Sequence, residues 1–64
     1  MLTQDAQREA IIDATAELLR RHGAAGLNVT AIMAEAGVSR TAFYRRLDTA
    51  HDAVTALLDR LLEH

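Results

Sequence analysis

The chain has 64 residues and a formal net charge of −2, which leaves room for one small domain and excludes a large enzyme. Half of the residues are apolar and a quarter are charged, as in globular domains rather than disordered segments, and the absence of cysteine excludes disulfides and thiolate zinc sites. Alanine makes up much of the apolar share, and the two aromatic residues are Phe43 and Tyr44, so the core is predicted to be thin and helical. No apolar run reaches the roughly 20 residues that a membrane span needs, and the N-terminus does not resemble a leader, so we expect a cytoplasmic protein without membrane contact.

The first predicted helix covers residues 3–22. Its apolar residues recur at three- and four-residue spacing, the period of one helix face, at Ile11, Ile12, Ala14, Leu18 and Leu19. The last turn carries cationic residues at 20–22, which suit the negative end of the helix dipole. Gly23 can then take the left-handed conformation that ends a helix.

Two short helices are predicted next, over residues 29–36 and 39–47. Asn28 and Ser39 are suitable N-caps, because their side-chain oxygens can accept a hydrogen bond from the free amides of the first turn. The glycine after residue 36 ends the first of these helices, and Phe43 on the second faces inward. Two short helices joined by a tight turn are typical of a helix-turn-helix.

A fourth helix is predicted over residues 49–63, where Thr49 and Asp52 form an acidic variant of the capping box. It carries an apolar stripe at Val54, Leu57, Leu58, Leu61 and Leu62. Residues 1–64 are therefore predicted to form one all-α domain, a three-helix, homeodomain-like helix-turn-helix bundle plus the start of a fourth helix.

Charge is unevenly distributed along the chain. Residues 37–47 contain three arginines and no acid, so this window carries +3 and, against a total of −2, the other residues sum to −5. Arginine can fork to the O6 and N7 atoms of guanine, threonine and tyrosine hydroxyls can reach phosphates, and the amides at a helix N-terminus attract anions. From the residues alone two interpretations stay open, that the third helix binds DNA or that its arginines form a solvated face.

Residues 8–58 resemble the N-terminal DNA-binding domain of the tetracycline-repressor (TetR) family of transcriptional regulators. The resemblance rests on Ile11, Ala14, Leu18, Gly23, Val29, Ile32, Ala36-Gly37-Val38-Ser39 and Phe43-Tyr44. Two runs, Ser-Arg-x-x-Phe-Tyr from Ser39 and Leu57-Leu58-Asp59-Arg60, are similar to the ethionamide-repressor branch. The chain departs from the family at Asp48, which adds a negative charge, and at Ala50, where members have a phosphate-binding lysine. These departures affect the strength of DNA contact more than the fold.

The resemblance implies that the third helix is the recognition helix, which reads duplex DNA from the major groove in a regulator that acts as a repressor. We expect Arg40 and Arg45 to contact bases, and Thr41, Tyr44 and Arg46 to contact phosphates. Supporting contacts are expected from Asn28, Thr30 and Ser39. Family members continue into a larger C-terminal domain that dimerises and binds a small-molecule inducer. We expect that domain to be absent here and the regulated protein to be a longer, homodimeric parent.

Other kinds of site are less well supported by the sequence. The main alternative function is a small interaction module, in which the partner binds a stripe formed by Leu57, Leu58, Leu61 and Leu62. The histidines at 22, 51 and 64 lack the spacing of a metal site and suit helix ends instead. Ser39 has no base beside it that could activate it as a nucleophile. We therefore expect no enzyme activity, no metal and no cofactor.

Overall fold

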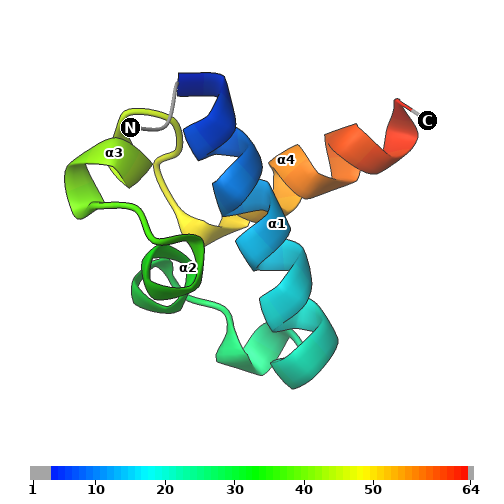
Figure 1. Ribbon diagram of the computed structural model, residues 1–64. Helices are drawn as coiled ribbons and strands as arrows, with labels where there is room; N and C mark the ends of the chain where they lie inside the picture. The colour runs from blue at the N-terminus through cyan, green and yellow to red at the C-terminus, as the bar shows by residue number, and fades with distance from the viewer. Residues whose placement is uncertain (1–3, 64) are drawn as a thin grey trace.

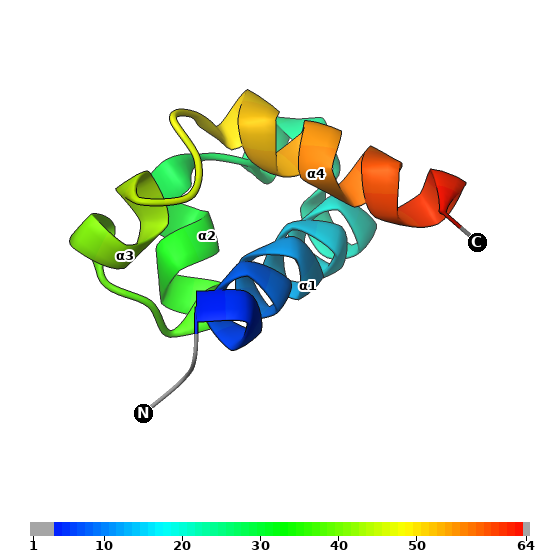
Figure 2. The same cartoon turned by 90° about the horizontal axis from the view of Figure 1, so that it is seen from above.

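The computed structural model describes residues 4–63, and the side chains of residues 6–63. Its elements are the helices α1 (Gln4–His22), α2 (Val29–Ala36), α3 (Arg40–Tyr44) and α4 (Ala50–Leu62), with a 3-10 turn, η1 (Ala24–Gly26), after the first. Residues 4–63 contain no strand, so the predicted all-α fold is confirmed. The views in Figures 1 and 2 place α2 and α3 together on one side of α1, while the C-terminal half of α4 points away from them. Within the same residues, no helix is long and apolar enough to span a bilayer.

The α1 helix ends before Gly23, as predicted, but the glycine adopts a different backbone conformation. Its φ of 68° and ψ of −172° lie outside the left-handed helical region, in an extended region that is open essentially to glycine alone. Its N–H group donates to the carbonyl of Leu19 at 2.9 Å. The chain then forms η1, a turn that the sequence pattern does not predict.

Side-chain caps fix the starts of α2 and α3. The Oδ1 atom of Asn28 accepts a hydrogen bond from the N–H of Ala31 at 2.8 Å, and the Oγ atom of Ser39 accepts one from the N–H of Ala42 at 3.1 Å. Gly37 takes the left-handed conformation, with φ 70° and ψ 32°, and ends α2. The helix over residues 29–36 therefore forms where its caps predict it.

The α3 helix ends three residues earlier than the predicted range of 39–47. The N–H groups of Arg46 and Leu47 both donate to the carbonyl of Phe43, each at 3.0 Å, and close the helix with a turn. Thr49 then has the extended backbone of an N-cap, with φ −144° and ψ 170°, and α4 begins at the next residue. Residues 45–48 therefore form a turn and a short loop between α3 and α4.

The α4 helix begins with the predicted capping box. The Oγ1 atom of Thr49 accepts from the N–H of Asp52, and the carboxylate of Asp52 accepts from the N–H of Thr49, both at 3.2 Å. The residues that α4 buries are Ala53 and Ala56. Small side chains, rather than the leucines of the apolar stripe, therefore pack on the rest of the fold.

One hydrophobic cluster joins all four helices. Phe43 of α3 is completely buried and belongs to a cluster with Ile11, Ala14, Leu18, Ile32 and Ala53. The buried hydroxyl of Thr15 donates to the carbonyl of Ile11 at 2.8 Å, so this polar group is satisfied inside the core. Because Phe43 is the only aromatic side chain in the cluster, it anchors α3 against the other helices.

Candidate nucleic-acid interface

Burial of one side of α3 directs its polar residues outward. Ala42 and Phe43 are buried, whereas Arg40, Thr41 and Arg45 are exposed. Figure 1 shows α3 at the edge of the fold, away from the C-terminal half of α4. The helix therefore presents a polar, cationic surface to the surroundings.

Tyr44 and Arg46 are both partly covered. The ring of Tyr44 packs edge to face against Phe43, with centroids 5.3 Å apart and planes at 80°, yet 45% of Tyr44 is exposed. Arg46 is half-buried, and its Nε atom is buried without a hydrogen-bond partner. Partial burial limits the movement of the Arg46 side chain more than that of the exposed side chains of Arg40 and Arg45.

The arginines of the chain divide into two groups. Four of them form ion pairs with acids, namely Arg8 with Glu9, Arg20 with Glu17, Arg21 with Glu17 and Glu35, and Arg60 with Glu9 and Asp13. The other three, Arg40, Arg45 and Arg46, form no ion pair with any acid among residues 6–63. The unpaired positive charge of the described chain is therefore concentrated on α3 and the turn that follows it.

Two of the paired arginines donate hydrogen bonds to their acids. The Nε atom of Arg20 lies 3.1 Å from a carboxylate oxygen of Glu17, and this hydrogen bond lowers the pKa of Glu17 although desolvation opposes the shift. Arg60 donates to Asp13 across 2.7 Å, and this hydrogen bond raises the pKa of the guanidinium against desolvation. Each of these two arginines has an acid within hydrogen-bond distance, so the pairs add little to the positive field around α3.

The residues predicted to support DNA contact lie in the first turns of α2 and α3. Asn28 and Ser39 use their side-chain oxygens as caps, so the donors left for a phosphate are the amide hydrogens of Asn28 and the hydroxyl hydrogen of Ser39. Thr30 is exposed on α2. No hydrogen bond joins Asn28 or Thr30 to the α3 residues in the described part of the chain. The structure thus divides the predicted site between two helices.

The loop between α3 and α4 carries an unpaired acid. The carboxylate that caps α4 belongs to Asp52, which accepts the N–H of Asp48 at 2.9 Å and the N–H of Thr49 at 3.2 Å. The carboxylate of Asp48 is exposed and has no partner among residues 6–63. His51, the second residue of α4, is also exposed. The basic surface therefore borders on a free negative charge.

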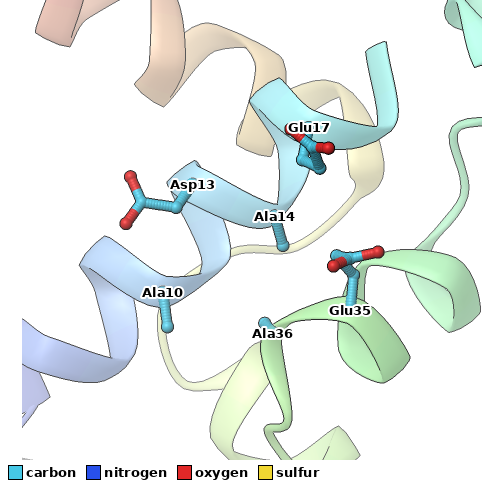
Figure 3. A pocket seen from close by; sticks show the side chains of 6 residues that line it. All are labelled: Ala10, Asp13, Ala14, Glu17, Glu35 and Ala36. Atoms are coloured by element: carbon cyan, nitrogen blue, oxygen red, sulfur yellow. The ribbon is translucent and has the colours of Figure 1, made fainter. Parts of the chain in front are cut away.

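A shallow groove between α1 and α2 offers little for ligand binding (Figure 3). It is lined by three alanines and three acids, namely Ala10, Ala14, Ala36, Asp13, Glu17 and Glu35. Each of the three carboxylates is paired with an arginine, so none is free for a cation. Among the described residues no three histidine or acidic side chains are placed to hold a metal ion, and His64 lies outside them.

The leucine stripe of α4 is a second candidate interface. Leu57 is half-buried, whereas the exposed fraction is 53% for Leu58, 62% for Leu61 and 83% for Leu62. Exposure therefore rises along the part of α4 that points away from α3 (Figure 2). Neighbouring exposed leucines on one helix form the kind of apolar surface that partners cover.

The sequence of the chain is similar to that of bacterial regulatory proteins. A family model described as bacterial regulatory proteins, tetR family, matches residues 11–48. Two HTH-type transcriptional regulators of Mycobacterium tuberculosis, from strains CDC 1551 and H37Rv, are each 39% identical to the chain over 57 residues. The matched segment is 89% of this chain but 24% of each relative, so the chain spans about a quarter of their length. No solved structure matches the chain.

Proposed function

Because the chain belongs to the tetR family of bacterial regulatory proteins, we propose that it binds duplex DNA as the DNA-binding domain of a transcriptional regulator that acts as a repressor. The observation that carries the proposal is the division of the arginines. Arg40, Arg45 and Arg46 have no acidic partner among the described residues, whereas the other four arginines do. Unpaired cations on an exposed helix attract phosphate, and the paired arginines leave the rest of the surface acidic.

In the proposed complex, α3 enters the major groove, whose width of about 12 Å admits a helix. Arg40 and Arg45 contact base edges, and their forked guanidinium groups suit guanine. Thr41, Tyr44 and Arg46 bind phosphates, which fix the register without reading sequence. Asn28 and Ser39 supply further donors to phosphates, and Thr30 supplies a polar contact in the groove.

We also propose that the regulated protein is longer than this domain and acts in the cytoplasm as a homodimer. Two copies of α3 would then reach half-sites about 34–36 Å apart, one turn of the duplex. A small-molecule inducer would bind the additional domain and not this one. This function requires neither catalysis nor a cofactor. The likeness to the ethionamide-repressor branch stays a prediction.

Titration of a labelled duplex of random sequence tests the DNA-binding proposal. We expect a dissociation constant of about 10⁻⁴ to 10⁻⁶ M near physiological salt, as for non-specific binding by other proteins. Three unpaired arginines predict a slope of roughly −2 to −3 when the logarithm of the affinity is plotted against that of the salt concentration. Fluorescence anisotropy at several salt concentrations measures both. An affinity that does not fall with salt would contradict phosphate contact by these arginines.

A second candidate function, an interaction module, is favoured by the exposure of Leu58, Leu61 and Leu62. We propose that in this case a second copy of the chain covers the leucines. Covering one leucine side chain contributes roughly 1.5–3 kcal/mol, so three of them can stabilise a weak dimer.

Sedimentation at rising protein concentration tests this second function. The mass should rise from 7.0 kDa toward twice that value, and the variant Leu58→Gln/Leu61→Gln should stay at 7.0 kDa. Both replaced side chains are exposed, so the variant should fold like the parent. A monomer at all concentrations would exclude pairing of two copies through α4.

A further inference from the structure

Asp48 differs from most acids of the domain because its carboxylate has no partner. Four acids form ion pairs with arginines, namely Glu9, Asp13, Glu17 and Glu35. Asp52 caps α4. Asp48 follows Arg45 and Arg46 closely in the sequence, yet it pairs with neither of them. Opposite charges thus lie within three positions of one another along the chain without forming an ion pair.

The fold holds Asp48 at this position. Its N–H donates to the carboxylate of Asp52 at 2.9 Å, and the same oxygen accepts the next N–H along the chain. The turn after α3 fixes the chain on the other side, through the two N–H groups that donate to Phe43. Because Asp52 already caps α4, the carboxylate of Asp48 is left exposed to solvent.

We propose that Asp48 limits the affinity of the domain for duplex DNA of arbitrary sequence. The inference rests on the proposed DNA-binding function. Three residues span at most about 11 Å, so Asp48 lies within roughly one Debye length of the backbone of Arg45 at 0.1 M salt. A phosphate that approaches Arg45 or Arg46 is therefore repelled by Asp48, and this repulsion grows as salt is lowered and the Debye length increases. Attraction to phosphates alone then gives weak binding to DNA, and occupancy of a DNA site depends on contacts with its bases.

A matched pair of charge-removing variants tests this role. Asp59 is an exposed acid without an ion pair in the C-terminal half of α4, which points away from α3 (Figures 1 and 2). Asp48→Asn and Asp59→Asn therefore change the net charge equally but at different places. The full 64-residue chain is titrated against a labelled random duplex, and a melting curve of each variant checks that it is folded.

We expect Asp48→Asn to bind roughly threefold to tenfold more tightly than the parent at low salt, because one close like charge is removed. The gain should shrink as salt rises. Asp59→Asn should gain less than Asp48→Asn at each salt concentration, because the C-terminal half of α4 points away from α3. Equal affinities of the two variants, or weaker binding by Asp48→Asn, would overturn the inference. If neither the parent nor any variant binds DNA, the proposed function itself fails.

Discussion

Replacing Phe43 with alanine is expected to remove most of the stability of the domain. Phe43 is completely buried in the cluster that joins the four helices. Loss of a buried phenylalanine ring costs about 3–5 kcal/mol, whereas a domain of 64 residues has roughly 3–10 kcal/mol in total. Neighbours such as Ala14 and Ala53 have no side chain that can move into the cavity. Thermal unfolding followed by circular dichroism should show a melting temperature lowered by about 12–40 °C.

Tyr44→Ala is the matched control for this change. It removes the other aromatic ring of the chain, which packs edge to face on Phe43 but is 45% exposed. An aromatic pair contributes about 0.5–1.5 kcal/mol beyond the area it buries, so the control should melt much closer to the parent. If Phe43→Ala and Tyr44→Ala melted at the same temperature, the assignment of Phe43 to the centre of the core would be wrong.

The sequence predicts the helices best where a side chain or a glycine marks the end. Asn28 and Gly37 bound α2 in the predicted way, because a capping oxygen and a left-handed glycine act locally. The end of α3 carries no such marker, and the helix stops at Tyr44, three residues before the predicted end. Leu47 packs partly buried against the core, but it does so from the loop after α3 and not from the helix.

Hydrophobic periodicity gives an incomplete picture of α4. The leucines dominate the pattern because they are large, yet the buried positions are Ala53 and Ala56. Alanine lets two helix backbones approach closely, and Arg60 then reaches Asp13 on α1 across 2.7 Å. Periodicity identifies a helix and its apolar side, but the size of the space left by α1 decides which of these residues fit.

The sequence also predicts only part of the candidate site, namely the features that depend on neighbouring residues. The charge of +3 in residues 37–47 can be counted in the sequence. The sequence does not show which arginines are free, because some partners lie far apart along the chain. Arg21 pairs with Glu35 on another helix, and Arg60 pairs with acids about fifty positions away. No spacing rule predicts such partners. The structure adds that the basic surface is unpaired while the other arginines are neutralised.

Removing Arg40 and Arg45 together should abolish most of the proposed DNA binding without unfolding the domain. In the proposed complex both arginines contact base edges, and each cation held in the groove still displaces about one condensed counterion. At about 0.1 M salt one such release contributes roughly a factor of 8, so Arg40→Ala/Arg45→Ala should weaken binding to a random duplex about 60-fold and reduce the salt slope by about 2. The melting temperature should hardly change, because neither exposed side chain has an ion-pair partner among the described residues.

The variant Arg8→Ala/Arg20→Ala removes the same charge from α1, where both arginines face acids. If net charge alone governed the attraction, this variant would lose as much affinity as Arg40→Ala/Arg45→Ala. We expect it to lose less than about fivefold, because these cations are already neutralised and exposed charges beyond one Debye length are screened. Anisotropy titrations of both variants at the same salt concentrations compare the two losses. Equal losses would mean that α3 is not the DNA-binding surface, whatever the family of the chain.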